Sequence, residues 1–158
     1  MKKVAVFLLL IFVACTFCAC DPKPSGGGST DDNSQDQEIT EMYITIYDNK
    51  LEVTLENNSS VKALVELLKQ GNLTYTANDY GGFEKVGNIG HSLPQNDTQI
   101  TTSAGDVILY QGNQICLMVG SNTWSYTRIG KINGYSASEL ATLVGVGQGS
   151  AKITLSLE

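Results

Sequence analysis

The segment Trp-Ser-Tyr-Thr-Arg holds the side chains of this chain that are best suited to binding a ligand. In an extended strand, side chains alternate between two faces, so Trp124, Tyr126 and Arg128 should share one face. A guanidinium beside aromatic rings can bind a carboxylate, a phosphate or a peptide carbonyl through paired hydrogen bonds with cation–π support. The alternative is a structural arginine that pairs with Asp106 or Glu84 while the rings pack. Charged groups in small domains are usually paired, which favours the structural interpretation.

Further aromatic residues could complete a ligand groove around this strand. Tyr80, Phe83 and Tyr110 come from separate turns and strands along the chain. A groove of this kind suits a small molecule or an extended peptide. The single histidine lies in a polar segment. The candidate ligand-binding residues are therefore Arg128, Tyr126, Trp124, Tyr110, Phe83 and His91.

Several kinds of catalytic or metal site are disfavoured. His91, Ser92 and Asp97 are the residue types of a hydrolase triad, but no nucleophile elbow accompanies them. One histidine and Cys116 cannot form a zinc site, and Cys116 lies in an apolar run typical of a core residue. The glycine-rich run 145–149 follows an expected helix instead of opening one, so it predicts a helix end. We therefore assign no catalytic residue, metal ligand or cofactor.

The charge distribution limits the possible partners. The chain has a net charge of −6 at pH 7. The first 19 residues hold two lysines and no acid, so residues 20–158 carry a net charge of −8. No cluster of basic residues occurs, which argues against binding to nucleic acid and against electrostatic adhesion to anionic lipid. No motif specifies an oligomeric state.

Residues 1–19 have the pattern of a secretory leader, with two lysines before an apolar run. The run ends in Phe-Cys-Ala-Cys, which resembles the lipobox of bacterial lipoproteins. The resemblance implies cleavage before Cys20 and acylation of that residue. Cleavage before Cys15, or an ordinary leader with a soluble product, are the alternatives. Residues 20–40 are almost free of apolar side chains, which predicts a flexible tether. We expect a lipid-anchored protein of the bacterial cell envelope, facing the periplasm or the cell exterior.

Residues 41–158 should form one mainly β domain with two short helices. Asn57–Ser60 and Ser136 provide the helix caps, and 90–104 is expected to be a polar connection. The first hairpin should turn at Asp48-Asn49-Lys50. The predicted strands are 42–47, 51–56, 73–80, 83–89, 106–110, 114–119, 124–132 and 151–157. Their order favours a closed antiparallel β-barrel of about eight strands with helices over its open ends.

Four short motifs are similar to the small bacterial cyclophilin-like family. They are Ser92-Leu93-Pro94, Ala104-Gly105-Asp106, Leu109-Tyr110 and the run from Ser125 to Gly130. In addition, Ile129-Gly130-Lys131-Ile132 and the following helix resemble the ending of true cyclophilins. The resemblance covers about residues 41–158 and implies an eight-stranded barrel capped by two helices.

The resemblance leaves prolyl isomerase activity as the alternative function. In cyclophilins an arginine on the strand after the first helix donates to the prolyl nitrogen and lowers a rotational barrier of about 18–20 kcal/mol. Residues 73–89 contain no arginine, and Arg128 belongs to a later strand. We therefore expect a membrane-tethered cyclophilin-like binding module without this activity, with a divergent isomerase of envelope proteins as the alternative.

Overall fold

The computed structural model describes residues 38–158 of the chain. The expected leader, Cys15, Cys20 and most of the expected tether lie outside the described residues. Within the described part, residues 38–158, no helix is long and apolar enough to cross a membrane. The first strand of the described part starts at Glu41.

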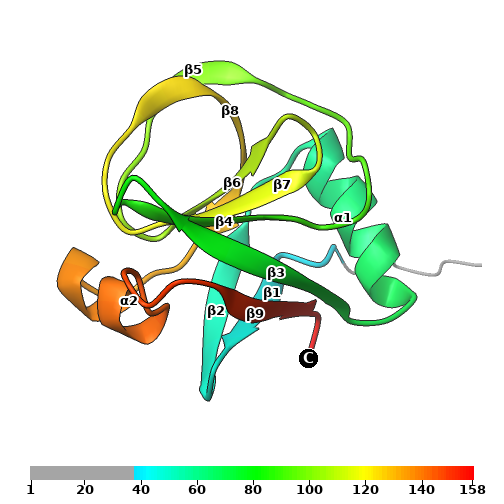
Figure 1. Cartoon of the computed structure of the whole chain (residues 1–158). Coiled ribbons are helices and arrows are strands. Elements are labelled where there is room, and N and C mark those ends of the chain that lie inside the picture. The colour runs from blue at the N-terminus through cyan, green and yellow to red at the C-terminus, as the bar shows by residue number, and fades with distance from the viewer. Residues whose placement is uncertain (1–37) are drawn as a thin grey trace, which may run out of the picture. The chain divides into compact units, whose positions relative to one another are not determined.

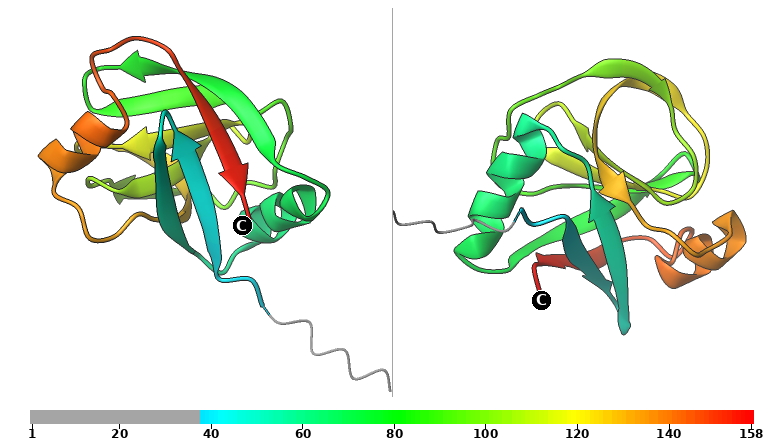
Figure 2. Two further views of the ribbon diagram at one scale, coloured as in Figure 1. Left: turned by 90° about the horizontal axis from the view of Figure 1, so that it is seen from below. Right: turned by 180° about the vertical axis from the view of Figure 1, so that it is seen from behind.

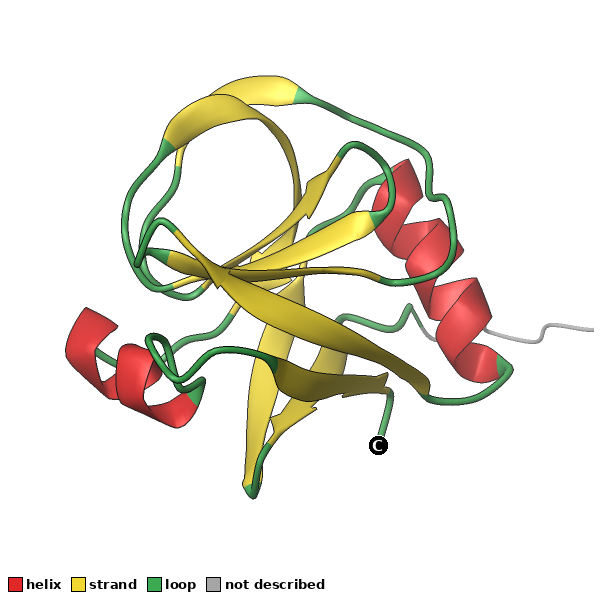
Figure 3. Cartoon of the chain, in the orientation of Figure 1, coloured by secondary structure: helices red, strands yellow, loops and turns green. Residues whose placement is uncertain are grey.

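Nine strands and two helices make up the domain (Figures 1 and 3). Their order is β1 (Glu41–Ile46), β2 (Asn49–Leu55), α1 (Ser59–Lys69), β3 (Leu73–Tyr80), β4 (Glu84–Asn88), β5 (Thr98–Thr101), β6 (Asp106–Tyr110), β7 (Gln114–Met118), β8 (Thr123–Lys131), α2 (Ala137–Leu143) and β9 (Ala151–Ser156). The predicted mainly β class with two helices is confirmed.

All strands belong to one antiparallel sheet in the order β2-β1-β9-β3-β4-β7-β6-β8-β5. An additional pairing of β2 with β8 joins eight of the strands into a ring of hydrogen bonds. This closing pairing is short, with Thr54 opposite Lys131 and Leu55 opposite Gly130. Figure 2 shows α1 and α2 on opposite sides of the domain.

Both helices begin at the residue types that the sequence places there. The Asn58 side chain accepts a hydrogen bond from the Val61 backbone N–H at 3.0 Å, which satisfies one of the unpaired donors of α1. Ser136 and Glu139 form the predicted capping box of α2. The apolar stripe of α1 is buried in the main core, with Leu64 fully inaccessible to solvent.

Two expectations about strands were wrong. Thr98–Thr101 forms β5 within the segment 90–104, which we expected to be a connection. Most of its side chains are exposed, and its sequence has no hydrophobic pattern that would predict a strand. The strand forms because its backbone pairs with β8. The first hairpin turns at Tyr47 and Asp48, since Ile46 pairs directly with Asn49.

Apolar side chains gather in two separate clusters. The large cluster takes the inward residues of β1, β2, β9, β3, β6 and β7 together with α1. A smaller cluster occupies the other face of β6 and β7 and contains Ile108, Cys116, Met118 and Tyr126. The alternation of β6 and β7 therefore buries both of their faces, as their unbroken apolar sequences predict. The position of Cys116 as a buried core residue is confirmed.

Candidate functional site

A cavity of about 410 Å³ opens beside the smaller apolar cluster. Its lining comes from β3, β4, β6, β7, β8 and the turn before β8, and comprises Tyr80, Glu84, Val86, Tyr110, Gln114, Cys116, Asn122, Trp124 and Tyr126. Four of these residues are aromatic, and one has an acidic side chain. The volume lies within the range of small-molecule sites.

The strand that carries Trp124 and Tyr126, β8, follows a strongly curved course (Figure 1). β8 pairs with β5 through residues 123–126 and with β6 through residues 127–131. The register with β6 shifts between Val107 and Ile108, which marks a β-bulge. Bulges bend a strand and increase its twist, so this irregularity helps β8 to leave the plane of β6.

The aromatic side chains of the cavity are held in defined positions. The rings of Tyr110 and Tyr126 meet edge to face, with centroids 5.9 Å apart and planes at 71°. The Asn122 side-chain amide donates a 2.7 Å hydrogen bond to the Tyr126 hydroxyl oxygen. Trp124 is 57% exposed, so its ring is accessible from solvent. The cavity is thus lined by two tyrosine rings held by specific contacts and by a tryptophan ring that solvent can reach.

Glu84 is the buried acid of this cavity. The residue is 6% exposed, and its Oε2 atom has no hydrogen-bond partner in the part of the chain that the structure describes. Burial raises the pKa of the Glu84 carboxyl, and a hydrogen bond from the Cys116 thiol opposes that rise. Burial also raises the pKa of the Cys116 thiol, and the Glu84 carboxylate adds to this effect. A protonated Cys116 is a poor nucleophile, so this cysteine is a wall of the cavity.

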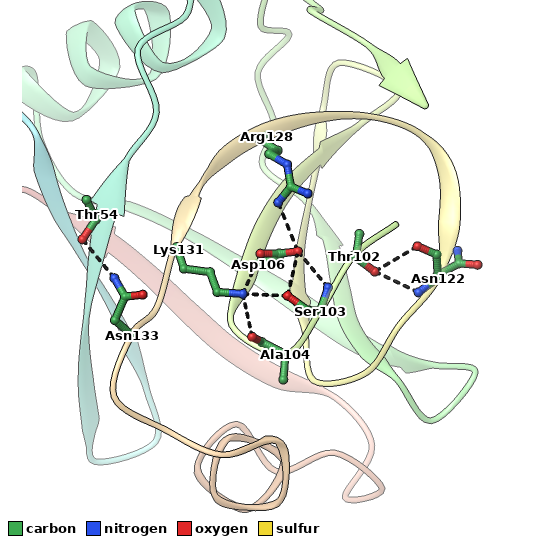
Figure 4. A network of polar contacts seen from close by, with 9 residues as sticks. All are labelled: Thr54, Thr102, Ser103, Ala104, Asp106, Asn122, Arg128, Lys131 and Asn133. Atoms are coloured by element: carbon green, nitrogen blue, oxygen red, sulfur yellow. Dashed lines mark hydrogen bonds and ion pairs between the residues drawn. The ribbon is translucent and has the colours of Figure 1, made fainter. Parts of the chain in front are cut away.

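Arg128 lies outside the cavity lining and pairs with Asp106 at the start of β6 (Figure 4). Its Nη1 atom is 3.2 Å from Asp106 Oδ2, and Lys131 Nζ is 2.8 Å from Asp106 Oδ1. Burial raises the pKa of the Asp106 carboxyl, but hydrogen bonds from Lys131 and the Ser103 backbone, with the charges of Lys131 and Arg128, lower it overall. The pairing with Asp106 that the sequence suggested is present.

The structure brings together only some of the predicted ligand-binding residues. Tyr110, Trp124 and Tyr126 line the cavity, whereas Phe83, His91 and Arg128 do not. Phe83 contacts Tyr80 edge to face, with centroids 6.0 Å apart. His91 is exposed in the connection between β4 and β5. Asp97 accepts a 2.6 Å hydrogen bond from Thr127 Oγ1.

Glu84 is the principal residue that the sequence analysis did not assign to a ligand site. Glu84 entered there only as a possible partner of Arg128, because a single acid in a short strand carries no motif. A weak signal was available in the alternation of β4, where Glu84 and Val86 share a face and Lys85 faces the other way.

The comparisons with known proteins agree on the fold. Among solved structures, a hypothetical protein from Archaeoglobus fulgidus is similar, with a TM-score of 0.58 and 18% identity over 78% of this chain and 99% of that chain. McbB in complex with tryptophan is also similar, with a TM-score of 0.53 and 14% identity over 73% of this chain and 44% of that chain. At these identities the likeness concerns the fold alone. No curated protein matches the sequence.

A family model described as the cyclophilin-like family matches residues 44–156, which include every strand that lines the cavity. This match covers most of the chain and agrees with the motifs and with the order of strands and helices. The chain belongs to the cyclophilin-like family.

Proposed function

We propose that the protein is a membrane-tethered binding module, with a closed β-barrel as its scaffold, and that its ligand occupies the aromatic cavity. The observation that carries the proposal is the buried Glu84 carboxyl among four aromatic side chains, with its Oε2 atom unpaired among the described residues. An unsatisfied buried acceptor destabilises a fold, so its presence in an open cavity supports a role in recognition. Phe83, His91 and Arg128 are left out of this site because they do not line the cavity.

Binding is tested by filling the cavity. Val86→Phe adds bulk to the lining while Trp124, the only tryptophan, remains as the fluorescence reporter. A panel of one-ring aromatic fragments, both neutral and charged, is titrated while Trp124 emission is recorded. We expect some fragments to bind the wild type and to bind Val86→Phe at least about tenfold more weakly, because the added ring occludes the site. Lys152→Phe, on exposed β9 surface, is the matched control and should bind like the wild type.

The Arg128→Ala variant tests whether the ligand binds in the cavity or at Arg128. Because Arg128 pairs with Asp106 outside the cavity lining, we expect fragment affinity to stay within about twofold of the wild type. If no fragment binds the wild type, or Val86→Phe binds as well as the wild type, the cavity is not the ligand site. If affinity is lost in Arg128→Ala but not in Val86→Phe, the site belongs to the arginine.

We also propose that the protein lacks prolyl isomerase activity, because it has no arginine in the required place. β3 and β4 carry no arginine, and the single guanidinium of the chain is engaged by Asp106. Without a placed donor, cis–trans exchange of a proline peptide should run at its uncatalysed rate in the presence of the protein. Acceleration above that background would contradict this part of the proposal and restore the enzyme alternative.

The membrane tether has an independent test. Mass measurement of the mature N-terminus should find an acylated Cys20, and Cys20→Ala should release the protein from membranes. An acylated Cys15 would show that cleavage occurs before Cys15 instead of Cys20. A soluble wild-type protein with an unmodified N-terminus would refute the proposed lipid anchor.

A further inference from the structure

The charges around the cavity indicate the chemical class of its ligand, an inference that rests on the proposed function of the cavity. Three lysine and arginine side chains near the sheet already have acidic partners. Lys85 Nζ is 2.7 Å from Asp79 Oδ1, and Arg128 and Lys131 both contact Asp106. None of the described residues that line the cavity is basic. Glu84 is therefore the one acid of the lining, and no counter-charge from the lining is available to it.

The aromatic walls favour the same sign of ligand charge as Glu84 does. The faces of tyrosine and tryptophan rings carry negative electrostatic potential, and a cation within about 6 Å of a ring centroid is attracted to it. Tyr80, Tyr110, Trp124 and Tyr126 all contribute to the lining. An anion would be repelled by the Glu84 carboxylate and would gain no cation–π attraction from these rings. A neutral ligand would leave Glu84 Oε2 without a charged partner.

From this juxtaposition we propose that the cavity binds an organic ammonium ion, with its charged nitrogen near the Glu84 carboxyl and its hydrocarbon part packed against Trp124 and the Tyr110–Tyr126 ring pair. A protonated amine would form a charge-assisted hydrogen bond with the Glu84 carboxyl, whose Oε2 atom has no partner among the described residues. The volume of about 410 Å³ accommodates an arylalkyl amine or the end of a lysine side chain. Burial of the carboxyl strengthens the ion pair relative to one in water.

The test compares three probes that share one ring and differ in charge. Phenethylammonium is the cation, 2-phenylethanol its neutral counterpart and phenylacetate the anion. Each is titrated into the whole protein at pH 7 and moderate salt, with Trp124 fluorescence and ligand-observed NMR as independent readouts. We expect phenethylammonium to bind at least about fivefold more tightly than the alcohol, and phenylacetate to bind most weakly.

Two variants assign the preference to Glu84. Glu84→Gln keeps the shape of the side chain and removes its charge, so the cation should lose its advantage over the alcohol while alcohol binding changes little. Glu52→Gln is the control, since Glu52 is an exposed residue of β2 outside the lining. It should retain the full preference for the cation. A cation preference that persists in Glu84→Gln would overturn the assignment of this residue.

The outcomes also separate this inference from the proposed function. If all three probes bind equally and Val86→Phe abolishes binding, the cavity is a ligand site but the ammonium class is wrong. If the alcohol or the anion binds more tightly than the cation, the class is again wrong. If phenethylammonium does not bind although other fragments do, the inference fails and the cavity proposal stands. If no fragment of any charge binds the wild type, both fail.

Discussion

Glu84 and Lys85 are consecutive residues of β4 that are both buried, yet within residues 38–158 only Lys85 has a counter-ion. Lys85 is fully inaccessible to solvent and donates to Asp79 and to the Gly149 carbonyl, each at 2.7 Å. Glu84 faces the other side of the strand, toward the cavity, and its Oε2 has no hydrogen-bond partner in the described part of the chain. Lys85 stabilises the fold through these contacts, whereas Glu84 lacks an ionic partner among the described residues, which supports the binding role proposed for it.

Glu84→Gln should stabilise the protein at neutral pH. The pKa of Glu84 is raised, so the folded state disfavours the ionised form, and stability is lost as pH rises from the ordinary value of 4.5 through the folded pKa. We expect Glu84→Gln to be about 1 kcal/mol more stable than the wild type at pH 7, and this gain to vanish below pH 4.5. Urea unfolding at both pH values measures it. A loss of stability at pH 7 would mean that the carboxylate is stabilised by partners, and Glu52→Gln should change stability little at either pH.

Asp79→Asn should destabilise the fold more than Lys85→Met does. The Asp79 carboxylate accepts from Lys85 and from the backbone N–H groups of Gly147 and Gly149. Asp79→Asn leaves the buried ammonium without an anion, whereas Lys85→Met leaves an Asp79 that keeps both backbone donors. We expect Tm to fall by roughly 5 °C or more in Asp79→Asn and by less in Lys85→Met. The double variant should recover part of the loss. Equal losses in both single variants would argue against this account.

Asp106→Asn should weaken the attachment of β6 to β8 in a pH-dependent manner. The pKa of Asp106 is lowered, so its stabilising contribution is present above the ordinary value of 3.8 and is lost as pH falls through the folded pKa. We expect a loss of about 1–3 kcal/mol at pH 7 that shrinks toward pH 2, measured by denaturant unfolding. Asp48→Asn, in the exposed turn between β1 and β2, should change stability by less than about 0.5 kcal/mol. A difference that does not depend on pH would exclude the ion pairs as its cause.

Gly130→Ala should open the ring of strands where β2 meets β8. A Cβ at this position would overlap the carbonyl oxygen of Thr54 and lie 2.7 Å from Val53 Cγ1. Neither β2 nor β8 can move apart at this point without breaking the short pairing of Leu55 with Gly130. We therefore expect the free energy of unfolding to fall by about 2 kcal/mol or more. Hydrogen exchange should show faster exchange of the Glu56 amide, which donates to the Ile129 carbonyl at 2.9 Å. Ser125→Ala, at an exposed position of β8, is the control. Unchanged protection of Glu56 would show that the closing contact tolerates a methyl group.

The sequence alone determined the elements that depend on neighbouring residues. Asn58 and the Ser136–Glu139 pair mark the helix starts because a cap acts on the turn that follows it. The alternation of Met42, Ile44 and Ile46 shows which face of β1 is buried. The placement of Cys116 in the core could also be read from its apolar strand.

Only the tertiary structure decided what depends on pairing between distant segments. β5 has no apolar pattern and forms because β8 pairs with it. The choice between the two interpretations of Arg128 depended on how close Asp106 lies, and the isolation of Glu84 follows from the packing of β7 and β8 around β4. A strand residue's face follows from local alternation, but its neighbours across the sheet depend on register and chain closure, which contacts over long sequence distances set.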